Sequence, residues 1–172
     1  KTEEKEFPLP CFIDKHGCFW CVCCHGTPNI ITGIKISREG FNPSNSGLYG
    51  PGIYFSTQLK KNIQYVKERN KNEISGGHIL ICLVRLGSNP YFTQSLGSNY
   101  PRDVTSIIAL GGYANFGWQV HTEIIIFEAN DALPLYSLTI EESYSHKVSG
   151  RLTRILMSKK YGILKRVDFK DY

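Results

Sequence analysis

A chain of 172 residues, 41% hydrophobic and 20% charged, has the composition of a single globular domain and not that of a disordered chain. Its apolar runs are too short for a membrane helix of roughly 20 residues, so the sequence predicts no membrane association. Residues 141–172 hold eight Lys or Arg and four Asp or Glu residues, which is +4 of the net charge of +5 and excludes a nucleic-acid-binding surface spread over the whole domain.

The first predicted elements are a strand and a helix. Residues 19–25, FWCVCCH, form a continuous apolar run that predicts a buried strand. Residues 28–40 open with Pro-Asn and end at Gly40, which suits a helix C-terminus. The isoleucines between them follow helical spacing: Ile30, Ile31, Ile34 and Ile36. We therefore expect a short helix over residues 28–40.

The elements that follow are mostly strands. Residues 41–52 consist of turn-forming residues, and residues 53–56 predict a short strand. Leu59, Ile63 and Val66 lie at helical spacing within residues 59–69 and predict a second helix. Further strands are predicted at residues 78–86, 106–112 and 122–129. Because strands dominate without regular alternation with helices, the sequence predicts an α+β fold with a largely antiparallel sheet and a few short helices.

Four of the six cysteines crowd into residues 18–24. Neighbouring cysteines on one strand are badly placed for the Cβ separation of about 3.8 Å that a disulfide needs. The sequence therefore predicts free thiols and a reducing, intracellular location, cytoplasmic or nuclear. A zinc site is the alternative, although it lacks the second distant pair of ligands typical of structural sites. Its ligands would be His16, Cys18, Cys21 and Cys23.

Three regions are predicted along the chain. Residues 1–18 form an N-terminal extension and residues 19–140 the folded domain. In the basic tail of residues 141–172, Leu152, Ile155, Leu156 and Ile163 are loosely spaced as in a helix. We expect this tail to be helical. Either it offers a surface for an acidic partner or nucleic acid, or its apolar residues pack on the folded domain and its lysines form the solvated face.

A series of short motifs carries a resemblance to a known family. HGT at residues 25–27 closes the first strand, GLYGPGIYFS occupies residues 47–56, KNIQY lies at 61–65, and TEIIIFEANDALPLYSL covers 122–138. In this order, over roughly residues 19–140, the chain resembles the catalytic domain of the poly(ADP-ribose) polymerases, which are ADP-ribosyltransferases of the diphtheria-toxin-like branch. The resemblance implies the ADP-ribosyltransferase fold, a split antiparallel β-sandwich that binds NAD+.

The resemblance also implies roles for individual residues. The family's catalytic His, Tyr and Glu fall on His25, Tyr54 and Glu123. Gly26 would offer backbone hydrogen bonds to the nicotinamide carboxamide, since no Cβ intervenes. His25 would bind the adenosine-side ribose. The motifs further place Thr27, Phe55, Lys61, Asn62 and Tyr65 in the NAD+ site, with Tyr54 and Tyr65 on the two faces of the nicotinamide ring.

Glu123 is the residue on which the predicted chemistry depends. Loss of nicotinamide from NAD+ passes through an oxocarbenium-like centre, as in glycoside cleavage, so a carboxylate beside the nicotinamide ribose stabilises charge that exists mainly in the transition state. The sequence thus predicts an enzyme, an ADP-ribosyltransferase that transfers ADP-ribose from NAD+ to an acceptor protein or nucleic acid, without a metal and as a monomer.

Three features of the sequence depart from the family pattern. Asn62 stands where many members have a small hydroxyl residue, only residues 42–46 form the loop over the donor site, and His121 precedes Glu123 by two positions. His121 speaks against the arginine and guanine acceptors of related toxins. The alternatives left open are a silent NAD+- or ADP-ribose-binding module, an RNA 2′-phosphotransferase, and a zinc and nucleic-acid interaction module.

Overall fold

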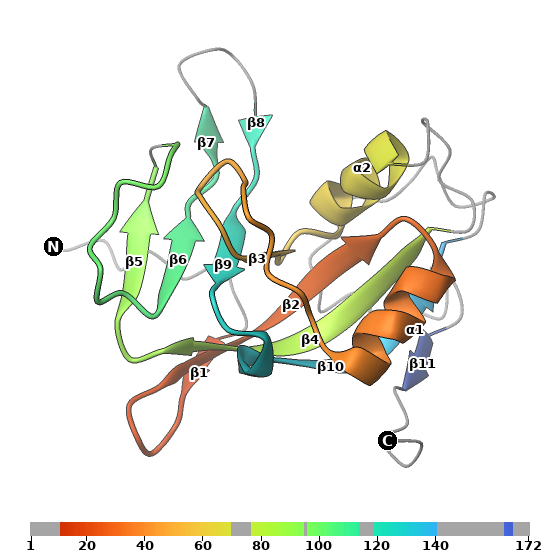
Figure 1. The fold of residues 1–172 in the computed structure, drawn as a ribbon, viewed down its shortest axis with the longest axis horizontal. Helices are drawn as coiled ribbons and strands as arrows, with labels where there is room; N and C mark the ends of the chain where they lie inside the picture. Colours follow the sequence, from red (N-terminus) through yellow and green to blue (C-terminus); the bar gives the residue numbers. More distant parts are fainter. Residues whose placement is uncertain (1–10, 70–76, 95, 114–118, 141–163, 167–172) are drawn as a thin grey trace, which may run out of the picture.

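The computed structural model describes residues 11–69, 77–94, 96–113, 119–140 and 164–166. These residues form one large sheet, a two-stranded ribbon and two α-helices (Figure 1). The helices are α1 (Ile30–Glu39) and α2 (Leu59–Arg69), and a 3-10 turn, η1, covers Ala129–Asp131. The strands are β1 (Cys11–Ile13), β2 (Phe19–Thr27), β3 (Ile53–Ser56), β4 (His78–Gly87), β5 (Pro90–Thr93), β6 (Ser106–Ala109), β7 (Gly112–Tyr113), β8 (Gln119–Val120), β9 (Glu123–Ile126), β10 (Ala132–Thr139) and β11 (Leu164–Arg166).

The large sheet has the order β11-β10-β4-β2-β3-β9-β6-β5, and β1 pairs with β2 outside this path. All of its pairs are antiparallel except β5 with β6. The predicted mixture of a largely antiparallel sheet with a few short helices is thereby confirmed. Each of the seven elements predicted between residues 19 and 129 is present, with its ends shifted by a few residues.

The two ends of the described chain contribute strands that were not predicted. Within the predicted N-terminal extension, β1 pairs with β2. Within the predicted helical tail, β11 pairs with β10, so the helix prediction is wrong at residues 164–166. Pairing with β11 satisfies backbone N–H and C=O groups along the open side of β10. This gain favours a strand at residues 164–166 over the helix that the loose apolar spacing suggested. The rest of the predicted tail helix, residues 141–163 and 167–172, lies outside the described residues.

The sheet is almost divided in two between β2 and β3. These strands are joined by a single residue pair, Cys24 with Ser56, whereas β2 pairs with β4 from Phe19 to Thr27. Beyond Cys24 the end of β2 diverges from β3 (Figure 1). The residues His25 to Thr27 therefore lie where the two halves of the sheet separate.

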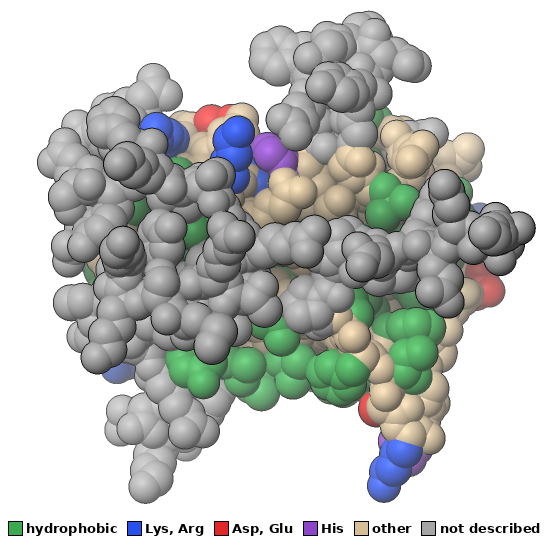
Figure 2. Space-filling model, turned by 180° about the vertical axis from the view of Figure 1, so that it is seen from behind, with side chains coloured by type: hydrophobic (Ala, Val, Ile, Leu, Met, Phe, Trp, Pro, Cys, Tyr) green, Lys and Arg blue, Asp and Glu red, His purple; other side chains and the backbone are tan. Residues whose placement is uncertain are grey.

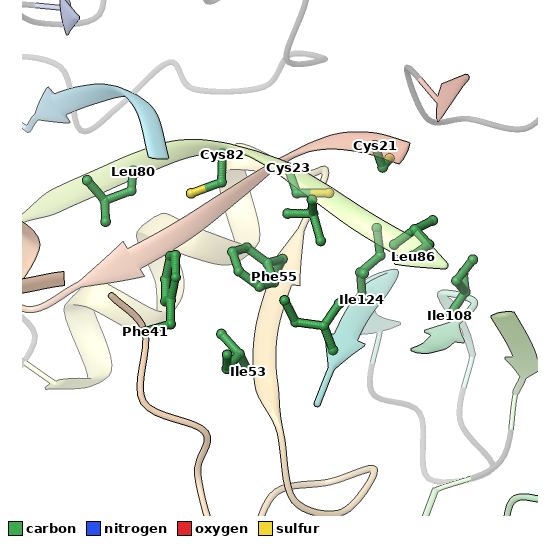
Figure 3. Close-up of a cluster of buried hydrophobic side chains, with 12 residues drawn as sticks. Cys21, Cys23, Phe41, Ile53, Phe55, Leu80, Cys82, Leu86, Ile108 and Ile124 are labelled. Atoms are coloured by element: carbon green, nitrogen blue, oxygen red, sulfur yellow. The ribbon is translucent and has the colours of Figure 1, made fainter. Parts of the chain in front are cut away.

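A hydrophobic core spans this division. Side chains from β2, β3, β4, β6 and β9 meet in one cluster, together with Phe41 (Figure 3). Its members include Cys21, Cys23, Ile53, Phe55, Cys82 and Ile124, all at most 3% exposed. These residues come from strands on both sides of the division. Their burial therefore holds together the two halves of the sheet, which backbone pairing alone would leave nearly separate.

Helix α1 packs through Gly33 and Ile36, and its other three isoleucines are exposed. The Asn29 side chain caps its first turn by accepting from the Thr32 backbone N–H at 2.9 Å. Gly33 is the buried position, and a Cβ there would lie 2.2 Å from Cδ2 of His78. Ile30, Ile31 and Ile34 are exposed among the described residues. The helical spacing was read correctly, but a close approach to β4 decides which face is buried.

The β1–β2 hairpin projects from the body of the molecule (Figure 1), and hydrophobic side chains gather near its base in the reverse view (Figure 2). Phe12 and Ile13 of β1 are more than half exposed. Asp14 holds the turn, because its carboxylate accepts from the backbone N–H groups of His16 and Cys18 and from the Trp20 indole.

Among the described helices, none is long and apolar enough to cross a membrane.

Candidate active site

A pocket of about 490 Å³ opens where the halves of the sheet separate. Its walls come from the end of β2, from β3, from the loop that precedes β3, from α2 and from the first residue of β9. The structure thus brings together residues that lie up to 98 positions apart in the sequence. Eight of the nine residues predicted to form the site line this pocket: His25, Gly26, Tyr54, Phe55, Lys61, Asn62, Tyr65 and Glu123.

Thr27 is the predicted residue that the structure places elsewhere. Its side chain is 1% exposed, and its hydroxyl lies 3.0 Å from the Asn29 carbonyl oxygen and 3.1 Å from that of His78. These contacts tie the end of β2 to the start of α1 and to β4. Thr27 therefore supports the backbone that positions His25 and Gly26 and does not line the pocket.

The His25 ring is fixed in one tautomer. Its Nδ1 lies 2.8 Å from the Tyr54 backbone oxygen, and a carbonyl oxygen only accepts, so Nδ1 carries the proton. Phe41 and Phe55 pack against the ring with centroid distances of 5.1 and 5.5 Å. Burial lowers the pKa of His25, which keeps the ring neutral near pH 7. Its Nε2 is then an acceptor, suited to a hydroxyl group of a bound molecule.

Stability is expected to fall on acidification, because burial lowers the pKa of three histidines, His25, His78 and His121, below their ordinary value of 6.5. Below about pH 6.5 the unfolded chain binds protons that the folded chain does not, so the stabilisation is present above this pH and is lost as the pH falls toward the lowered values. We expect a smaller free energy of unfolding in urea at about pH 5.5 than at about pH 7.5.

A variant that lacks one of the three histidines is the control for this pH dependence. In His78→Gln the difference between the two pH values should shrink, because one of the three groups no longer titrates. A free energy of unfolding that rises on acidification would show that the lowered pKa values have been assigned in the wrong direction.

Tyr54 closes the loop that forms one wall of the pocket. Its hydroxyl donates to the Gly50 carbonyl oxygen at 2.5 Å and accepts from the Tyr49 backbone N–H at 3.1 Å. Gly47 lies against the same hydroxyl, since a Cβ at position 47 would be 2.2 Å from it. The glycines of this stretch thus allow the loop to fold over the tyrosine. The ring of Tyr54 is thereby held in one orientation in the pocket wall.

Helix α2 supplies the opposite wall and approaches β2 very closely. A Cβ at Gly26 would lie 2.9 Å from the backbone oxygen of Asn62. Gly26 is therefore needed for the approach of the helix, a reason that the sequence did not reveal. Asn62 is 5% exposed, lines the pocket and donates through Nδ2 to the Gln58 backbone oxygen at 3.0 Å. Further along α2, the Arg69 guanidinium lies 5.4 Å from the centroid of the Tyr65 ring, one turn before it.

Glu123 is held at the floor of the pocket by the sheet. It begins β9 between Ser56 of β3 and Ala109 of β6, and it is 5% exposed. Oε1 of Glu123 lies 3.1 Å from Nζ of Lys61, an ion pair that offsets part of the cost of burying the carboxylate. The carboxylate is thus kept in the pocket as a fixed negative charge with one cationic neighbour.

His121 lies beside this ion pair. Its Nδ1 is hydrogen-bonded to Oε1 of Gln58. Burial, followed by the positive charges of Lys61 and Lys60, lowers the pKa of His121. His121 is therefore a neutral neighbour of the site, and its hydrogen bond to Gln58 gives it a structural role two positions before Glu123.

Ten residues that line the pocket were not predicted as site residues, and five of these lie within the motif at residues 47–56. The other five come from α2 and from the short loop. Glu68 and Arg69 follow Tyr65 by three and four positions on α2, so helical spacing places them near the same face and could have identified them. The other three belong to the short loop: Asn42, Ser44 and Ser46. Ser44 forms a β-bridge with Gly52, which folds this loop onto the pocket. The short loop thus contributes polar side chains to the pocket lining.

The described residues contain no group of three or more His, Cys, Asp or Glu side chains that could hold a metal ion. The ligands considered for the alternative zinc site, His16, Cys18, Cys21 and Cys23, do not assemble in this part of the chain.

A scan against protein-family models gave no match, and a search of curated proteins gave none either. The inference about function therefore rests on the geometry of the pocket and on the residues that line it.

Proposed function

We propose that this protein is an NAD+-dependent ADP-ribosyltransferase. The observation that carries the proposal is the convergence of His25, Tyr54 and Glu123 on one pocket, in which a buried carboxylate faces aromatic side chains and a backbone glycine. A core cluster could bring two such residues together by packing alone. It would not leave a carboxylate and a neutral histidine acceptor both lining open space.

Glu123 would act on the bond between nicotinamide and ribose. As nicotinamide leaves, positive charge develops on the ribose, and a carboxylate about 4 Å away at an effective dielectric of about 20 stabilises it by about 4 kcal/mol. Such a contribution corresponds to roughly a thousandfold in rate. Lys61 reduces this field in the free protein, and its displacement toward an acceptor oxygen of the substrate would release the full charge of Glu123.

The remaining pocket residues would bind the ends of NAD+. Tyr54 of β3 and Tyr65 of α2 both line the pocket, and their rings would stack on the nicotinamide ring. The neutral Nε2 of His25 would accept a hydrogen bond from a ribose hydroxyl. Together these groups would orient the bond to be cleaved over Glu123, which is the positional part of catalysis.

Loss of the Tyr54 ring is expected to weaken binding of nicotinamide-like inhibitors such as 3-aminobenzamide. Tyr54→Ala removes a stacking face, and we expect roughly tenfold weaker binding by calorimetry. Tyr54→Phe keeps the face and loses the hydrogen bonds to Gly50 and Tyr49, so it should bind within a few fold of the wild type. Its free energy of unfolding should fall by about 1–2 kcal/mol.

The two variants separate stacking from structural support. Unchanged inhibitor binding in Tyr54→Ala would show that the ring is a wall residue only. His25→Ala should also weaken binding, because it removes the acceptor Nε2.

A silent NAD+-binding module is the second candidate, and the ion pair between Lys61 and Glu123 favours it. A carboxylate that remains neutralised by a lysine 3.1 Å away gives little stabilisation to a developing cation. Such a protein would bind NAD+ and leave it intact.

The experiment that tests the proposal is incubation with NAD+ labelled in the ADP-ribose part, together with candidate protein and nucleic-acid acceptors. Mass determination of the products should find one ADP-ribose unit or more on an acceptor. Binding of NAD+ without any labelled product would favour the silent module, and no binding of NAD+ would contradict both candidates.

A further inference from the structure

The β1–β2 hairpin brings together two cysteines that are ten residues apart. In the antiparallel pairing of β1 with β2, Cys11 lies directly opposite Cys21. Their Sγ atoms are 2.7 Å apart, and both cysteines are free. Cys21 is fully buried in the core cluster, whereas Cys11 is partly exposed at the base of the projecting hairpin.

This arrangement meets the geometric requirements of a cross-strand disulfide. Residues directly opposite in an antiparallel pair have Cα atoms about 4.5–5.5 Å apart, which is within the range that disulfides span. The Sγ atoms need to approach by well under 1 Å to reach the S–S bond length of about 2.05 Å. Asp14 holds the turn between the two strands, which keeps β1 in register with β2 and the two thiols opposite one another.

We propose that Cys11 and Cys21 are a redox-active pair that forms a disulfide linking β1 to β2 in the presence of a low-molecular-weight disulfide such as oxidised glutathione. This pair is independent of the proposed transferase activity. Cys23 and Cys82 are also opposite one another, on β2 and β4, but both are fully buried and offer no thiol to a reagent in solution.

The reaction is a pair of thiol–disulfide exchanges. The Cys11 thiol, as its thiolate, attacks oxidised glutathione, forms a mixed disulfide and releases one molecule of glutathione. The Cys21 thiolate then attacks Sγ of Cys11 and releases the second glutathione. The two cysteines lose two protons and two electrons, and the glutathione disulfide gains them. The contact with Cys21, together with burial, raises the pKa of the Cys11 thiol. For Cys21 the contact with Cys11 lowers the pKa, but the contact with Cys23 and burial outweigh it, so this pKa is raised as well. The exchange is therefore slow near neutral pH and faster in mild alkali.

The disulfide would stabilise the fold and leave the pocket unchanged. Closing a loop of about eleven residues removes chain entropy from the unfolded state, and in a chain of this length the midpoint temperature of unfolding should rise by about 5–10 °C. Cys21 lies four residues before His25 on the rigid strand β2, so binding at the pocket should not depend on the oxidation state of the pair.

The test uses the full chain, first reduced and freed of reductant, then incubated with excess oxidised glutathione at about pH 8. After quenching with N-ethylmaleimide in denaturant, the protein should have lost two hydrogen atoms and should carry the reagent on four of its six cysteines. Tryptic cleavage after Lys15 separates Cys11 from Cys21, and chymotryptic cleavage after Trp20 separates Cys18 from Cys21. Fragmentation of the linked peptides should join Cys11 to Cys21.

Two variants complete the test. Cys11→Ser, at a partly exposed position, should abolish both the mass change and the rise in midpoint temperature. Cys18→Ser, in the same hairpin, should retain both. Six alkylated cysteines after oxidation, a glutathione adduct that never resolves, or a link between other cysteines would each overturn the proposal.

Discussion

Replacing Glu123 with glutamine is expected to reduce ADP-ribose transfer by about 100-fold or more while NAD+ binding stays within a few fold of the wild type. The variant removes the charge that would stabilise the oxocarbenium-like transition state and keeps the size of the side chain. Its amide oxygen can still accept from Lys61, so the fold should be retained. Initial rates of product formation from labelled NAD+, with calorimetric binding of NAD+, measure the two effects separately.

The matched control is Glu128→Gln. Glu128 follows β9 on the same segment but does not line the pocket, so its loss of charge should leave transfer within about twofold of the wild type. A Glu123→Gln protein that keeps more than about a tenth of wild-type transfer would remove Glu123 from the catalytic role.

Replacing Gly26 with alanine is expected to weaken both the fold and binding at the pocket. The new Cβ would lie 2.9 Å from the backbone oxygen of Asn62, and backbone cannot move aside as a flexible side chain can. Helix α2 would have to shift, and with it Lys61 and Tyr65. We expect the free energy of unfolding to fall by about 1–3 kcal/mol and binding of 3-aminobenzamide to weaken by about tenfold or more.

Gly17→Ala is the control for backbone strain. Gly17 lies in the β1–β2 turn with φ of 78°, and nothing is within 4 Å of a Cβ built there. This variant should lose stability through strain alone and leave inhibitor binding unchanged. If Gly26→Ala binds the inhibitor as the wild type does, the contact with Asn62 does not set the position of α2.

Patterns along the sequence predicted the elements that carry the site. The apolar run before His25 and the isoleucines after Glu123 are continuous, whereas Leu59, Ile63 and Val66 follow the helical period. The structure contains the corresponding β2, β9 and α2. These patterns work because burial of one face, or of both, decides the local structure.

Strand β10 was not predicted, because Pro134 lies within it. Proline lacks an N–H and is normally excluded from the interior of a sheet. Here the pairing of β10 with β4 shifts register between Pro134 and Tyr136, and this irregularity accommodates the proline. Strand β5 likewise begins at a proline, Pro90. Local propensity argues against both strands, and only their partners in the sheet reveal them.

Close approaches between elements were also beyond the reach of sequence patterns. The glycine against Asn62 and the glycine against His78 depend on where α2 and α1 pack on the sheet, and the Cys11–Cys21 contact depends on the register of β1 with β2. The predicted role of Gly26 in binding a carboxamide supplied one reason for a glycine. Its packing against α2 is a second and independent reason, which appears only once the helix is placed.

The most direct test of the account is release of nicotinamide from NAD+ by the wild-type protein without any added acceptor. Water then serves as the acceptor, so the measurement does not depend on the identity of the natural one. We expect nicotinamide and ADP-ribose in equal amounts, formed at a rate that Glu123→Gln lowers by about 100-fold or more. NAD+ that binds in the pocket and remains intact in the wild type would contradict the central claim that this pocket cleaves the bond between nicotinamide and ribose.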